Sequence, residues 1–181
     1  MTVDPHGVDC VFCGIAAGTE PARVVADTAE TLTFLPVRPV HPGHVLVVPR
    51  RHVADIWELD EETAAAVGAA VLRAAHAVRA AHRPEGLNVI QSSGAVATQS
   101  VFHLHVHVVP RYQGDRMPYL WPAKTEETEE TEETEETEET EETEETEETE
   151  KTEKAEKTEE DPALLDDSAR RLRSALTARR H

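Results

Sequence analysis

The sequence predicts an α+β fold. Short apolar and β-branched segments, separated by turns, are typical of strands, and one long segment among them has helical periodicity. A third observation concerns the stretch 100–112, in which His103, His105 and His107 alternate with aliphatic residues. Strand periodicity over this stretch would place all three imidazoles on one face, where they can supply a nucleophile, a proton donor and a metal ligand.

The acidic charge of the chain is concentrated in one segment. Residues 125–160 contain 21 Glu and 3 Lys, which accounts for the whole formal net charge of −18. The rest of the chain is therefore close to neutral, and the low isoelectric point describes the acidic segment only. We expect no direct binding to nucleic acid.

Neither a signal peptide nor a membrane span is expected. The N-terminus lacks a basic region followed by an apolar run, and no 18 consecutive residues are apolar. The two cysteines, Cys10 and Cys13, are too few for a disulfide framework. They indicate a cytoplasmic protein that uses cysteine for metal or redox chemistry.

The first element is a short turn of helix over 10–17, opened by Cys10 and Cys13. A C-x-x-C turn can bring both sulfurs to one tetrahedral zinc ion. It is also found as a redox pair, or as two incidental buried thiols. The spacing alone leaves these three interpretations open.

Three strands are expected next, over 22–26, 31–37 and 44–49. The loop before the third strand is rich in proline and glycine, and we interpret His41 and His44 as loop residues that hydrogen-bond the backbone. His52 follows the third strand. By itself it could be a surface histidine at the end of a strand.

The segment 60–82 is the long helix. Asp60 is a suitable N-cap, and a stripe at helical spacing should lie on the sheet, namely Val67, Val71, Ala74, Val78 and Ala81. We interpret His76 and His82 as solvated. A fourth strand over 87–91 and a loop of small residues over 92–98 lead to the histidine stretch.

The last part of the chain divides into a repeat and a helix. Thr-Glu-Glu triplets over 125–150 have no side chain to bury, which predicts a solvated spacer. Asp161 and Pro162 then begin a helix with a basic face and an apolar stripe of Leu165, Ala169, Leu172 and Leu176. We therefore divide the chain into a domain at 1–122, an acidic spacer at 123–160 and a basic amphipathic helix at 161–181. The alternative for the helix is a self-contained segment that binds an acidic partner.

The segment His-Leu-His-Val-His-Val-Val-Pro-Arg, residues 103–111, resembles the signature of the histidine-triad (HIT) superfamily of nucleotide hydrolases and transferases. Other segments agree with the family in the same order: Cys10–Cys13, Pro39–His44 followed by Val45–Pro49, His52, and Gln99–His103. The similarity covers about residues 9–122 and excludes the acidic repeat. It implies an antiparallel sheet of about five strands packed on one long helix, and a homodimer.

The resemblance also implies roles for individual residues. His105 would be the nucleophile that forms a covalent nucleotidyl-histidine, with its tautomer fixed by a nearby main-chain carbonyl, and His107 would bind phosphoryl oxygens and assist proton transfer. Gln99, Ser100 and Ser92 would contact phosphate. In the zinc-containing bacterial branch, a structural Zn²⁺ would be held by Cys10, Cys13, His52 and His103. The substrates would be nucleoside 5′-phosphate derivatives such as phosphoramidates and dinucleoside polyphosphates.

Three positions depart from the family pattern. Pro36 replaces a residue that binds ribose hydroxyls, Ser92 replaces Asn or Gln, and Thr98 replaces a glycine. These departures motivate one alternative, a nucleotide-binding adaptor with little catalysis. Another alternative is a zinc-dependent hydrolase in which the triad binds a catalytic metal. Trp121 could close the active site, as in bacterial members, or be a packing residue.

Overall fold

The computed structural model describes residues 10–115, 117 and 161–178. Its elements, in chain order, are α1 (Val11–Ala17), β1 (Arg23–Asp27), β2 (Thr31–Leu35), β3 (Val45–Pro49), η1 (Ile56–Glu58), α2 (Glu61–His82), β4 (Gly86–Gln91), η2 (Ala95–Ala97), β5 (Val106–Arg111) and α4 (Pro162–Ala178). The elements η1 and η2 are short 3-10 helices. Trp121, the Thr-Glu-Glu repeat, Arg179 and Arg180 lie outside the described residues.

The strands form an antiparallel sheet in the order β1-β2-β3-β5-β4. The first three strands follow one another as neighbours, whereas β5 enters between β3 and β4. This placement brings the last histidine of the triad into the middle of the sheet, where His107 stands opposite Leu46 on one side and Ile90 on the other. The predicted α+β fold with a five-stranded antiparallel sheet is confirmed.

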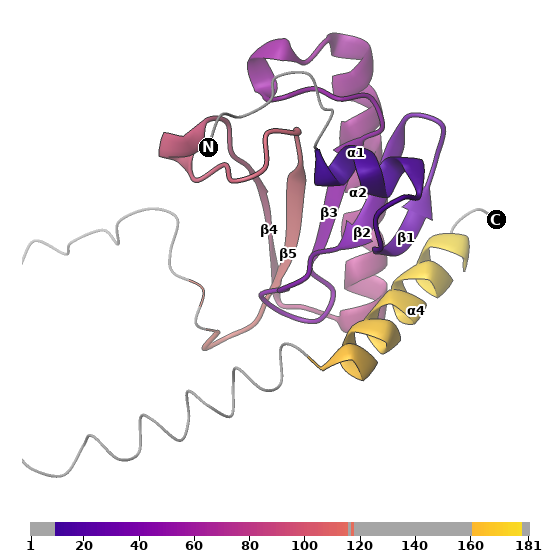
Figure 1. Cartoon of the computed structure of the whole chain (residues 1–181). Helices are drawn as coiled ribbons and strands as arrows, with labels where there is room; N and C mark the ends of the chain where they lie inside the picture. The colour runs from indigo at the N-terminus through magenta and orange to yellow at the C-terminus, as the bar shows by residue number, and fades with distance from the viewer. Residues whose placement is uncertain (1–9, 116, 118–160, 179–181) are drawn as a thin grey trace, which may run out of the picture.

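Both faces of the sheet are covered. On one face, α2 and α4 pack on a large apolar cluster that includes Val45, Val47 and Val108. On the other face, α1 covers a smaller cluster of Leu32, Phe34, Leu46 and Val48. Figure 1 shows α2 behind the sheet and α1 in front of it. Because alternate residues of β2 and β3 enter different clusters, every residue of these two strands is buried.

The long helix α2 begins and ends where the sequence predicts. The Asp60 carboxylate accepts a hydrogen bond from the backbone N–H of Thr63 at 2.7 Å, and Arg83 ends the helix in the left-handed conformation. By length and composition alone, α2 could cross a membrane. Its buried side chains nevertheless belong to the core on the sheet: Val67, Ala70, Ala74, Ala77 and Val78. One face of α2 therefore packs on the core.

The C-terminal helix α4 packs on α2 and β1 and extends the larger core. The Asp161 carboxylate accepts a hydrogen bond from the backbone N–H of Ala163 at 2.9 Å, and Pro162 is the first helical residue, as predicted. The predicted apolar stripe faces the core, with Leu172 only 1% exposed. The helix therefore belongs to this fold, and the alternative of a helix that stands apart from the core is not supported.

The expectation of one strand over the whole histidine stretch is wrong in its length. The strand β5 begins at Val106, and the segment with His103 and His105 leads into it. The register explains this boundary, because the pairing of β3 with β5 ends at Val47 opposite Val106. Before that point, the backbone N–H of Leu104 donates to the carbonyl of Val53 at 2.6 Å, beyond the end of β3.

Candidate active site and metal centre

Four predicted metal ligands from three segments converge beside α1. Cys10 is the N-cap residue of α1 and Cys13 lies in its first turn, His52 follows β3, and His103 precedes β5. Their potential ligand atoms all lie within 4.8 Å of one another. The Sγ of Cys13 lies 3.3 Å from Nδ1 of His52 and 3.5 Å from Nδ1 of His103, and the Sγ of Cys10 lies 3.4 Å from the same atom of His103. The group could hold a metal ion.

The surroundings of His103 prepare it as a ligand. Its Nε2–H donates to the carbonyl of Pro49 at 2.9 Å, and because a carbonyl only accepts, Nδ1 keeps the lone pair that faces the thiols. Burial lowers the pKa of His103 to about 4, which keeps the imidazole neutral near pH 7. Burial, with Cys10 adjacent, raises the pKa of the Cys13 thiol to about 11. A cation bound there would displace that proton.

His105 is held by the main chain of its own segment. Its Nδ1–H donates to the carbonyl of His103 at 2.8 Å, so in the neutral ring the free lone pair is on Nε2. The side chain is buried, and its ring lies between the rings of Phe12 and His107, with centroid distances of 5.4 Å and 5.1 Å. This tautomer presents an unprotonated nitrogen, which is what a nucleophile requires.

His44 is a residue of the site that the sequence interpretation missed. Its Nδ1 accepts a hydrogen bond from the backbone N–H of Val40 at 3.1 Å, as expected for a loop histidine. Its other ring nitrogen, Nε2, lies 2.9 Å from Nδ1 of His107. Burial is the first cause that lowers the pKa of His44 to about 3 and of His107 to about 4, with the neighbouring histidine charges adding to it. Both rings are therefore neutral near pH 7.

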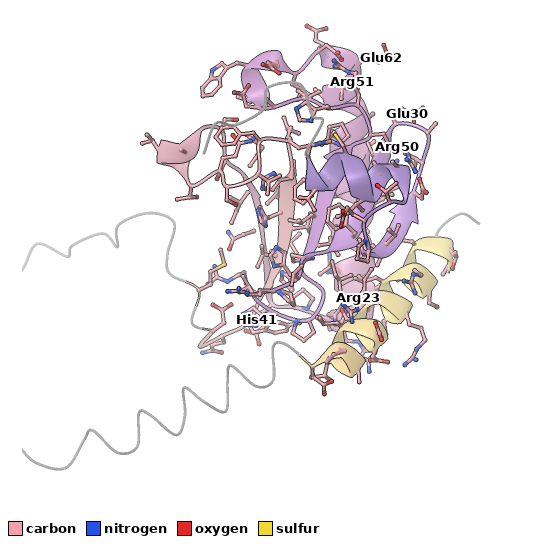
Figure 2. All side chains as sticks on the ribbon, viewed as in Figure 1. Arg23, Glu30, His41, Arg50, Arg51 and Glu62 are labelled. Atoms are coloured by element: carbon pink, nitrogen blue, oxygen red, sulfur yellow. The ribbon has the colours of Figure 1, made fainter. Side chains whose placement is uncertain are left out.

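The loop that carries His44 is fixed at the end of the sheet opposite Arg51 (Figure 2). His41 Nε2 lies 3.4 Å from Asp115, and hydrogen bonds from Arg111 hold the pKa of that carboxyl well below its usual range. A Cβ on Gly43, where φ is +96°, would approach the ring of His82 to 2.7 Å. That ring is half-buried and lies 3.2 Å from the Ser168 hydroxyl of α4, so the interpretation of His82 as solvated is wrong.

Gln99 is buried, and its amide holds the loop that precedes the triad. Its Nε2 donates to the carbonyls of Ala54 and Val101 at 2.7 Å and 3.1 Å, which occupies both of its N–H groups. Its Oε1 accepts from the backbone N–H of Gly94 at 2.7 Å. In this arrangement the Gln99 side chain has no N–H left to donate to a phosphate. The other two predicted phosphate contacts differ in burial, since Ser100 is exposed and Ser92 is half-buried.

Thr98 lies in the left-handed region, with φ +68° and ψ +17°, where it ends η2. This conformation is unfavourable for a β-branched residue and natural for glycine. Thr98, which replaces the glycine of the family pattern, therefore has a strained backbone conformation. The strain lies directly before Gln99, in the loop that leads to the triad.

Known proteins are similar to this chain in sequence. The HIT domain family model matches residues 17–114. Protein hit from Bacillus subtilis is 38% identical over 120 residues, which cover 66% of this chain and 83% of that protein. Adenosine 5′-monophosphoramidase hnt1 from Schizosaccharomyces pombe is 38% identical over 104 residues, 58% of this chain and 75% of that protein.

Solved structures of histidine triad proteins are similar to this chain in fold. A zinc-bound histidine triad family protein from Mycobacterium smegmatis is similar with a TM-score of 0.67 and 30% identity, over 95% of this chain and 96% of that one. A HIT family member from Bacillus subtilis is similar with a TM-score of 0.61 and 39% identity, over 64% and 82% of the two chains. Sequence and fold therefore agree, and the chain belongs to the HIT domain family.

Proposed function

We propose that this protein is a nucleotide hydrolase or transferase that cleaves nucleoside 5′-phosphate derivatives at the α-phosphate through a covalent nucleotidyl-His105. The observation that carries the proposal is the hydrogen bond from His105 to the carbonyl of His103, because in the neutral ring it leaves the free lone pair on Nε2. Membership in the family and similarity to a protein named as a monophosphoramidase support a nucleotide hydrolase. Phosphoramidates and dinucleoside polyphosphates are the proposed substrate classes.

The reaction has two steps. First, Nε2 of His105 attacks the α-phosphorus, a P–N bond forms, and the bond from phosphorus to the amine or phosphate leaving group breaks. Water then attacks the same phosphorus, the P–N bond breaks and His105 departs with its lone pair restored, and the proton that water loses balances the one taken up by the leaving group. One difficult displacement is thereby replaced by two easier ones.

His107 is the proposed hydrogen-bond donor to the phosphoryl oxygens, and the direction of its own hydrogen bonds supports this role. A backbone N–H only donates, so the bond from Val40 leaves Nδ1 of His44 as an acceptor and places the proton of neutral His44 on Nε2. That Nε2–H donates to Nδ1 of His107. The proton of neutral His107 then sits on its own Nε2, where it can donate a hydrogen bond to the phosphoryl oxygens.

Phosphate binding is proposed for the loop before the triad. Ser100 offers an exposed hydroxyl and Ser92 a half-buried one, and both lie beside the residues that Gln99 holds in place. The backbone N–H groups of such a loop can also bind phosphate oxygens. We therefore propose that Gln99 contributes mainly by holding this loop in its conformation.

Zinc is the proposed metal. Two thiolates and two imidazoles are a donor set that tetrahedral Zn²⁺ prefers, and the orientation of His103 toward the thiols fits it. Four protein ligands would complete the coordination shell, so the ion would be structural and would fix α1 against the two histidine segments. This favours a structural site over the alternative of a catalytic metal.

A homodimer in the cytoplasm is proposed for the assembled protein. Large apolar side chains are exposed on the face of α2 and on the edge strand β4, where Leu72 is 60% and Val89 is 53% exposed. A second copy could cover both positions. The nucleotide is proposed as the small-molecule partner.

The test is release of AMP from adenosine 5′-phosphoramidate by the native chain and by His105→Asn. The variant should lose at least about 1,000-fold in kcat and still bind AMP, because only the attacking atom is removed. His76→Asn, which changes a histidine of α2 outside the site, is the matched control and should keep native activity. Intact-mass analysis of the native protein after rapid quenching should show one added nucleotidyl group.

Two results would contradict the proposal. If His105→Asn keeps most of the activity, the covalent mechanism is wrong. If the native chain binds AMP tightly without turnover of phosphoramidate or diadenosine polyphosphate, the adaptor alternative replaces the enzyme.

A further inference from the structure

The helix α1 depends on tertiary contacts for its position. It has seven residues, and its N-cap residue, Cys10, makes no capping hydrogen bond through its side chain. A helix this short is not stable alone. Three contacts hold it: the two thiols at the histidine cluster, apolar packing on β2 and β3, and a hydrogen bond from Nη1 of Arg50 to the carbonyl of Ala16 at 2.6 Å.

Phe12 lies between the two cysteines and points into the sheet. Its side chain is 8% exposed and packs in the smaller apolar cluster. Its ring contacts three others nearly edge to face, with centroid distances of 5.4 Å to Phe34, 5.9 Å to His103 and 5.4 Å to His105. The residue thus touches a proposed metal ligand and the proposed nucleophile at once.

The ring of His105 needs this neighbour. One hydrogen bond, from Nδ1 to the carbonyl of His103, fixes the tautomer and one point of the ring. A second contact is required to fix the ring plane and the direction of Nε2. Phe12 lies at 80° to the ring plane of His105 and His107 at 65° to it. Of these two, only Phe12 is attached to the segment that carries Cys10 and Cys13.

We infer that Phe12 is a positioning residue through which the C-x-x-C turn sets the orientation of the nucleophile His105. The inference rests on the proposed function in taking His105 as the nucleophile. The C-x-x-C turn would then affect the turnover rate through Phe12, without any contact between a metal ion and the substrate. A displacement of about 1 Å at a reacting atom can cost about 100-fold in rate, so loss of this contact should be visible in kcat.

The experiment compares Phe12→Leu with the matched control Phe34→Leu. Phe34 lies in the same cluster and packs against Phe12, and among the described residues its ring contact is with Phe12 and with no histidine. Both variants remove one aromatic ring and leave an aliphatic side chain. The measurements are kcat and KM for adenosine 5′-phosphoramidate, bound zinc, the thermal midpoint, and the NMR shifts of the His105 ring protons, which sense the ring current of Phe12.

Phe12→Leu should lower kcat by about 10-fold or more, with KM within about 2-fold, and should move the His105 ring-proton shifts. Phe34→Leu should lower the thermal midpoint to a similar extent, with kcat within about 2-fold and the His105 shifts in place. Each variant should keep its zinc.

The inference is overturned if zinc-loaded Phe12→Leu keeps native kcat, or if Phe34→Leu loses the same activity. Absence of turnover in the native chain, combined with moved His105 shifts in Phe12→Leu, would overturn the proposed function while supporting the placement of the ring. The two failures are therefore distinguishable.

Discussion

His44 shows how a single residue acquires a role from its two ring nitrogens. Nδ1 is occupied by the backbone N–H of Val40 and Nε2 by His107, and the side chain is 3% exposed. The hydrogen bond from Val40 requires the neutral ring, because a protonated ring could not accept it. Burial and these partners keep His44 neutral in the folded protein and leave it free to titrate in the unfolded chain.

This difference predicts a pH dependence of stability. Burial lowers the pKa of folded His44 to about 3, whereas the unfolded value is about 6.5. Between these values the unfolded chain binds the additional proton, so stability is present above pH 6.5 and is lost as the pH falls toward 3. Relative to His44→Asn, the native chain should lose up to about 1.4 kcal/mol more per pH unit below pH 6.

Urea unfolding of both proteins from pH 8.5 to pH 5.5 measures this slope. Above pH 7.5 the two curves should run parallel, because His44 is neutral in both states there. Equal slopes below pH 6 would show that folded His44 titrates normally and would contradict the hydrogen-bond direction assigned to it.

The sequence predicted those site residues that stand at a recognisable spacing along the chain. Cys10 and Cys13, with His103, were predicted because fixed spacing and the family signature identify them, and the structure brings them together with His52. His44 had no such spacing. Its partner His107 is 63 residues away and becomes its neighbour only because β3 and β5 pair.

At the scale of elements, periodicity predicted the regular structure well. The stripe on α2 and the stripe on α4 both face the core, because an amphipathic helix has one way to bury its apolar side. The boundaries at 1–122, 123–160 and 161–181 stay a prediction, although α4 shares its core with α2. The start of β5 could not be predicted, because the histidine alternation continues past the point where β3 stops pairing.

The end of η2 gives a prediction at this scale. Thr98 adopts φ +68°, which costs a residue with a Cβ about 1–2 kcal/mol, and part of this is returned by the lower chain entropy of unfolded threonine. Thr98→Gly should therefore stabilise the protein by about 0.5–1 kcal/mol in urea unfolding. Thr98→Ala is the control. It keeps a Cβ and so should stay within about 0.5 kcal/mol of native, and a glycine variant no more stable than the alanine variant would show that the turn is unstrained.

At the scale of the whole molecule, the candidate metal centre joins segments that are distant in sequence. Cys10 and His103 are separated by 93 positions, and their atoms lie 3.4 Å apart. The centre links the front helix α1 to the loop after β3 and to the segment before β5. Among the residues that the structure describes, few other contacts fix α1, so this link should contribute substantially to the stability of α1 on the sheet and, through Phe12, to the orientation of His105.

Metal removal tests this contribution. Elemental analysis of the native protein should give about one zinc per chain, and removal by a strong chelator should lower the thermal midpoint by about 10 °C, as expected for a loss of about 3 kcal/mol or more. Re-addition of Zn²⁺ should restore the midpoint and release protons, because the Cys13 thiol, with its pKa raised to about 11, is protonated without metal.

Cys13→Ser should reproduce the chelated state without any chelator, since three donors remain and the sulfur closest to His52 is gone.

The residual turnover of the chelated protein distinguishes a structural metal ion from a catalytic one. With a structural ion, kcat should fall together with the order of α1 and should recover with any tetrahedral divalent ion that refolds it, such as Co²⁺ or Cd²⁺. Activity that instead tracks the Lewis acidity of the ion, at unchanged stability, would make the metal catalytic and the covalent role of His105 wrong.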